Sequence, residues 1–100
     1  MIRCRIDLLK TSIIEVEDEY AKEQSGCSCL DDFDALSFVD KDGGICVWFN
    51  GKPKLETIAH ESVHLANLVI ERAGLFYSSK EDELLAYLVG YIFEKLRSDD

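Results

Sequence analysis

The sequence contains few of the residues that mark disordered or membrane-spanning chains. It has one proline and six glycines in 100 residues, and 47% of its residues are hydrophobic, which is typical of a folded globular protein. No apolar run approaches the ~20 residues that a membrane-spanning helix needs. The length predicts a single domain, residues 1–100, with one hydrophobic core.

Basic residues are also scarce. Eleven Lys and Arg against twenty Asp and Glu leave a net charge of -9, whereas nucleic-acid backbones and anionic membranes require a concentrated positive surface. We therefore expect neither as a partner, and the commonest consequence of such a charge is solubility. The first ten residues, MIRCRIDLLK, carry charges where a signal peptide has its apolar stretch, which predicts a cytoplasmic location.

Two segments in the first quarter of the chain have secondary-structure patterns. Residues 2–8 alternate apolar and polar side chains, which predicts a half-buried strand. Residues 12–24 are predicted as a helix, because Ser12 and Glu15 stand at capping-box spacing and Gly26 ends the apolar pattern.

The remaining segments predict a hairpin and two helices. Residues 36–39 and 45–49 are rich in β-forming side chains and flank a turn of Asp, Lys and Gly, which predicts a β-hairpin. Helices are expected over 55–73, ended by Gly74, and over 79–97. The expected fold class is α+β: a short antiparallel or mixed sheet with the hairpin packed on the first of these helices and on the C-terminal helix.

Apolar side chains recur at helical spacing along both of these helices, and we predict that they face the core. The first helix carries the stripe Ala59, Val63, Ala66, Ile70 and Ala73. The second helix carries Leu84, Leu85, Leu88, Val89, Ile92, Phe93 and Leu96.

The only two histidines, His60 and His64, stand four residues apart on the first of these helices, with Glu61 directly after His60. Residues four apart share one helix face, ~6 Å apart along the axis, so two imidazoles can share one tetrahedral zinc ion. The Glu61 carboxylate can then take a proton from a zinc-bound water as it attacks a polarised carbonyl. The run HESVH therefore has the pattern of H-E-x-x-H metallopeptidases. The same pattern also occurs by chance, and both histidines are then ordinary helix residues.

A catalytic zinc ion that keeps one position open for water needs a third protein ligand. Glu83, Tyr87 and Gly90 form a stripe on the last helix that is separate from its apolar face, and a mid-helix glycine commonly marks a close approach of two backbones. We infer that this stripe faces the motif helix, which makes Glu83 the best third ligand and Tyr87 a catalytic group that either polarises the carbonyl or supports a zinc ligand. The alternatives are a helix-start acid for Glu83 and a core aromatic for Tyr87.

The run ICVWFNGKPKLETIAHESVHLANLVIERAG, followed by DELLAYLVGYIFEKL, resembles the small zincin-like metallopeptidase domains of phages, prophages and bacteria. Those domains are similar to minimal gluzincins, and the resemblance covers about half the chain, residues 45–96. It implies His60, His64 and Glu83 as zinc ligands and Glu61 as the general base. It also implies a peptide or protein substrate, in a bacterial or phage-infected host cell.

In such folds the strand before the motif helix, residues 45–49 here, is an exposed sheet edge on which an extended peptide can pair. Trp48 would then line the cleft, or it is a buried hairpin aromatic. The chain has no counterpart of the C-terminal subdomain that closes the cleft in larger gluzincins, which counts against efficient proteolysis.

The four cysteines are expected as reduced thiols, because no secretory signal accompanies them. Cys27 and Cys29 could instead join His60 and His64 in a closed structural zinc site. Their separation by a single residue matches no common zinc-finger pattern.

The sequence thus predicts a zinc metallopeptidase-like enzyme. The alternative is a non-catalytic, zinc-stabilised acidic interaction protein, phage-encoded, that binds and modulates a host protein.

Overall fold

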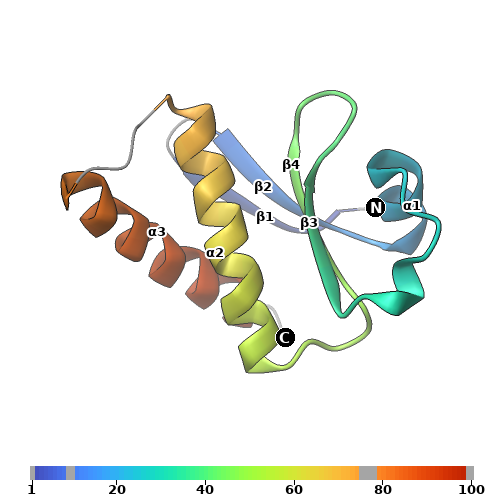
Figure 1. Cartoon of the computed structure of the whole chain (residues 1–100). Helices are drawn as coiled ribbons and strands as arrows, with labels where there is room; N and C mark the ends of the chain where they lie inside the picture. Colours follow the sequence, from blue (N-terminus) through green and yellow to red (C-terminus); the bar gives the residue numbers. More distant parts are fainter. Residues whose placement is uncertain (1, 9–10, 75–78, 99–100) are drawn as a thin grey trace.

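The computed structural model describes residues 2–8, 11–74 and 79–98. These residues form a four-stranded sheet, three α-helices and one short 3-10 helix, so the α+β class is confirmed (Figure 1). In chain order the elements are β1 Ile2–Leu8, β2 Thr11–Val16, α1 Asp18–Ser25, η1 Leu30–Asp32, β3 Ala35–Val39, β4 Ile45–Phe49, α2 Leu55–Arg72 and α3 Ser79–Ser98.

The sheet is mixed, with the strand order β1-β2-β4-β3. β1 pairs with β2 and β3 pairs with β4 in antiparallel fashion, whereas β2 and β4 run parallel. The predicted hairpin is confirmed as β3 and β4, with Ala35 opposite Phe49 and Val39 opposite Ile45. β4 is an interior strand, and all five of its residues are buried.

The side chains of β4 alternate between two hydrophobic layers, one on each face of the sheet. Ile45, Val47 and Phe49 pack with α2 and α3 in one layer, which we call the α2 layer. Cys46 and Trp48 pack with α1 and η1 in the other, the α1 layer. Figure 1 shows α2 and α3 together on one side of the sheet and α1 on the other. A strand buried on both faces explains the nearly continuous apolar run in its sequence.

The prediction of a helix over residues 12–24 was right for its second half, which is α1, and wrong for its first half, which is strand β2. Ile13 packs in the α2 layer and Val16 in the α1 layer, so the strand is buried on both faces and its apolar spacing imitates a helix. Ser12 does not cap a helix. Its hydroxyl donates a hydrogen bond to Asp7 Oδ1 across the β1–β2 pair, with an O···O distance of 2.6 Å.

The motif helix α2 ends as predicted, with Gly74 in the left-handed region at φ 73°. Its buried face, however, is not the predicted stripe: Ala59, Val63 and Ala73 are exposed. The buried residues of α2 are Ile58, Glu61, Ser62, Leu65, Ala66, Val69 and Ile70. The helix is therefore turned so that its bulkier aliphatic side chains meet the sheet and α3, because burying them removes more apolar surface from water.

The predicted core face of α3 is confirmed. Leu88, Ile92 and Leu96 are buried in the α2 layer, and the other four apolar residues of that face pack against it while half-buried. Within the described part of the chain, no helix is long and apolar enough to cross a membrane.

Candidate functional site

The three motif residues lie along a groove between α2 and β3. Two adjoining hollows make up this groove, and His60, Glu61 and Ala35 line both of them. The first hollow is also lined by Asp34, Glu56 and Thr57. The second is also lined by Leu36, Ser37, His64, Asn67 and Leu68. The groove exists because α2 packs over β3 and β4, which brings one side of the helix beside the outer strand of the sheet.

His60 and His64 are exposed, and their rings converge. The distance between the two Nε2 atoms is 3.2 Å, and the ring planes meet at 74°. Two nitrogens bound to one tetrahedral zinc ion at about 2.0–2.1 Å lie about 3.3 Å apart, so this pair fits two positions of a zinc site. The same distance also allows an N–H···N hydrogen bond between neutral rings.

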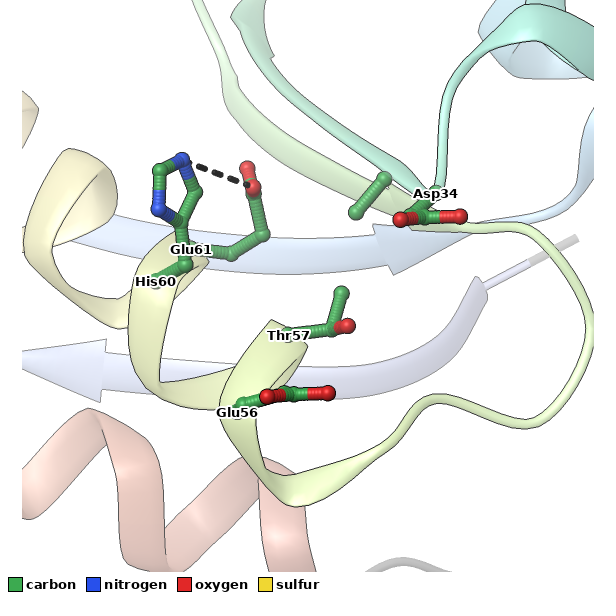
Figure 2. Close-up of a pocket in the computed structure, with 6 residues that line it drawn as sticks. Asp34, Glu56, Thr57, His60 and Glu61 are labelled. Atoms are coloured by element: carbon green, nitrogen blue, oxygen red, sulfur yellow. Dashed lines mark ion pairs between the residues drawn. The ribbon is translucent and has the colours of Figure 1, made fainter.

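Glu61 is the buried member of the motif, with 6% of its surface exposed. Its Oε1 accepts a hydrogen bond of 2.6 Å from the hydroxyl of Ser37 on β3. Its other oxygen, Oε2, lies 3.9 Å from Nε2 of His60. Figure 2 shows the His60 ring and the Glu61 carboxylate turned toward one another on the same side of α2. A carboxylate thus lies within reach of the histidine pair, as the motif predicts.

Ser37 was not among the residues predicted from the sequence. It is 24 residues away from Glu61, and no spacing rule connects a strand residue to a later helix. No pattern in the sequence marks Ser37, because the face of β3 that meets α2 is set by the sheet register and not by local spacing.

The predicted packing of Glu83, Tyr87 and Gly90 against α2 is wrong. Glu83 is exposed, the Tyr87 side chain is 73% exposed, and a Cβ added at Gly90 would meet nothing within 4 Å. The apolar face of α3 takes the side toward α2 and the sheet, so the Glu83 stripe points outward. Gly90 therefore does not mark a close approach of backbones.

The structure does not bring Glu83 or Tyr87 to the histidine pair. Among the side chains that the structure describes, those of residues 5–8, 11–74 and 83–98, no group of three or more His, Cys, Asp or Glu is arranged to hold a metal ion. Tyr87 instead lines a separate hollow on α3 with Tyr91 and Glu94. The ligand role of Glu83 and the catalytic role of Tyr87 therefore stay predictions.

The edge of the sheet beside the motif helix is β3, not residues 45–49 as expected. β4 is interior, because β2 and β3 flank it. Trp48 does not line the groove: it is 2% exposed, lies in the α1 layer and donates a hydrogen bond of 2.7 Å from Nε1 to Asp18 Oδ1. The buried alternative for Trp48 is the correct one.

The closed cysteine–histidine site is also contradicted. Cys27 packs in the α1 layer, so the sheet separates it from His60 and His64 on α2. Cys27, Cys29 and Cys46 carry free thiols. The pKa of the Cys46 thiol is raised to about 12, mainly because the thiol is buried and secondly because the Asp40 carboxylate lies nearby.

The groove, the converging imidazoles and the buried carboxylate are thus properties of the fold, whereas the zincin-like family and the zinc ion rest on the motif. Comparisons with protein-family models, with curated proteins and with solved structures gave no match to this chain.

Proposed function

We propose that this protein is a zinc-dependent peptide hydrolase in which His60 and His64 bind the metal and Glu61 is the general base. The observation that carries the proposal is the 3.2 Å between the two Nε2 atoms, next to a buried carboxylate. Zinc, when bound, supplies a Lewis acid that activates water and polarises a peptide carbonyl.

The residues of the chain have distinct tasks in this proposal. Glu61 accepts the proton of the attacking water. Because Glu61 is buried, bulk water does not compete for its carboxylate. β3 is the outer strand of the sheet that the described residues form, so an extended peptide can pair with its outer edge. A peptide in that position would pass His60 and Glu61 along the groove.

An open catalytic zinc site needs a third protein ligand besides His60 and His64. We retain Glu83 as the candidate because the zincin resemblance implies it. In the described structure Glu83 is exposed on the outward face of α3. It would reach His60 and His64 only if α3 took a different position against α2.

One observation favours a second function, a non-catalytic zinc-stabilised interaction protein. The described residues offer the metal two imidazoles but no third side chain. In that case Glu61 would serve only to join α2 to β3 through Ser37.

The variant Glu61→Gln distinguishes the two functions. The 100-residue chain would be stripped with a chelator, reloaded with one equivalent of zinc and incubated with a pool of internally quenched random decapeptides. We expect the wild type to hold zinc and cleave some of the peptides. Glu61→Gln should hold the same amount of zinc and lose about 10²–10⁴-fold in rate, because the base is gone and the ligands remain.

Two controls accompany this experiment. His60→Ala should lose both zinc and activity. Glu71→Gln is the same glutamate-to-glutamine substitution at an exposed position near the end of the same helix, and it should change neither. A zinc-loaded wild type that cleaves no peptide, but is more heat-stable than the zinc-free protein, would support the interaction protein. Cleavage by Glu61→Gln at the wild-type rate would remove Glu61 from the mechanism.

A further inference from the structure

The hydrogen bond between Ser37 and Glu61 connects the outer strand to the motif helix. In the register of the sheet Ser37 stands opposite Val47, whose side chain lies in the α2 layer. Ser37 therefore presents its hydroxyl to the α2 side. Its Oγ donates to Glu61 Oε1 over 2.6 Å, a length typical of a hydroxyl bound to a charged carboxylate.

The burial of Glu61 makes this hydrogen bond consequential. A carboxylate that is 6% exposed has lost most of its contact with water, and it needs hydrogen bonds to compensate. Among the described residues, Ser37 supplies that donor. With Oε1 held by Ser37, the carboxylate cannot rotate freely, and Oε2 stays on the side of His60, 3.9 Å from Nε2.

We infer that Ser37 is a positioning residue for the general base: its hydroxyl orients the Glu61 carboxylate so that Oε2 faces the histidine pair and the groove. The inference rests on the hydrolase function proposed above. Ser37 acts through Glu61 and takes no part in the chemistry itself. Ser37 belongs to the strand on which the peptide would pair. The same residue would therefore lie beside the substrate and orient the general base.

The test compares Ser37→Thr with Ser37→Val. Threonine and valine have nearly the same shape and both suit a strand, but only threonine keeps the hydroxyl. With a peptide that the wild type cleaves, Ser37→Val should lower kcat about 10–100-fold while KM and zinc affinity stay within about 2-fold. Ser37→Thr should restore most of the loss. This pattern separates positioning from a structural role, which would lower the melting temperature of the valine variant and leave kcat per folded molecule unchanged.

Ser12→Ala is the matched control. Ser12 makes a serine–carboxylate hydrogen bond of the same 2.6 Å length to Asp7, in the β1–β2 pair outside the groove. It should leave kcat and KM unchanged.

Three results would overturn the inference. Equal kcat values for Ser37→Val and Ser37→Thr would mean that the hydroxyl is not needed. Loss of zinc from Ser37→Val would mean that the residue supports the metal ligands rather than the base. A zinc-loaded wild type that cleaves no peptide would remove the proposed function itself, and the inference with it.

Discussion

Asp40, which lies outside the groove, joins α1 to the β3–β4 turn through hydrogen bonds of its side chain. Its Oδ2 accepts a hydrogen bond of 2.8 Å from the Tyr20 hydroxyl on α1, and its Oδ1 accepts from the backbone N–H groups of Gly44 and Asp42 in the β3–β4 turn. Burial alone would raise the Asp40 pKa, but the hydrogen bonds from Gly44, Tyr20 and Asp42 outweigh it and hold the pKa below its usual range. A Cβ at position 44 would lie 2.9 Å from Asp40 Oδ2, so a larger residue there would have to displace this hydrogen-bonded carboxylate.

The Tyr20–Asp40 hydrogen bond predicts an alkaline loss of stability. The bond raises the pKa of Tyr20 to about 12, whereas a tyrosine in the unfolded chain titrates near 10. The stabilisation is therefore complete below about pH 10 and is lost as the pH rises toward 12. We expect Tyr20→Phe to lower the free energy of unfolding by about 1.5 kcal/mol at pH 8, with the difference from wild type shrinking above pH 10.

Urea unfolding at pH 8, 9, 10 and 11 would measure this difference. Tyr87→Phe is the control, because its side chain is 73% exposed, and it should match the wild type at every pH. A Tyr20→Phe protein as stable as the wild type at pH 8 would show that the hydrogen bond contributes nothing.

At the scale of elements, the orientation of α2 decides which motif residues are accessible. Turning the buried face onto Ile58, Leu65 and Val69 buries Glu61 and leaves His60 and His64 exposed. The predicted apolar stripe would have placed all three motif residues on one separate face. The actual arrangement gives the carboxylate a protein donor and leaves the imidazoles open to a metal.

Two valines on α2 test this orientation. Val69 is 1% exposed, whereas Val63 is 43% exposed. Val69→Ala should lower the free energy of unfolding by about 2 kcal/mol, because it removes two buried methyl groups and leaves a cavity. Val63→Ala should be neutral or slightly stabilising, since alanine has the higher helix propensity. Chemical denaturation of both variants would measure this, and equal losses would contradict the assigned faces.

Secondary structure was predictable where a helix has one polar face or where turn residues separate two β-rich runs. α2 and α3 each have a polar face, so their helical period is visible in the sequence, whereas the hairpin was recognised by its turn of Asp, Lys and Gly even though β4 is buried on both faces. β2 contributes Ile13 to one layer and Val16 to the other, and its pattern is therefore ambiguous between strand and helix.

At the scale of the whole molecule, β4 joins the two hydrophobic layers. Its side chains alternate between the α2 layer and the α1 layer. If one layer unfolded, β4 would be disrupted, and the other layer would then lose its central strand. The fold should therefore unfold as one cooperative unit.

Trp48 reports on this cooperativity, since it is the only tryptophan and lies buried in the α1 layer. We expect its fluorescence and the far-ultraviolet circular dichroism of the helices to follow one urea transition with the same midpoint. Far-ultraviolet dichroism is dominated by α2 and α3 in the other layer, so two separated midpoints would mean that the layers unfold independently.

The sequence by itself determined the local features: the H-E-x-x-H helix and its glycine end, the β-hairpin, the apolar face of α3 and the spacing that lets two imidazoles meet. Each depends on neighbours within a few residues, which a spacing rule can describe. Only the tertiary structure decided that β3 is the sheet edge beside α2, that Ser37 binds Glu61 and that Glu83 and Tyr87 face away from the groove. These features depend on strand order and on the rotation of each helix against the sheet, and both are set by packing between residues far apart in the chain.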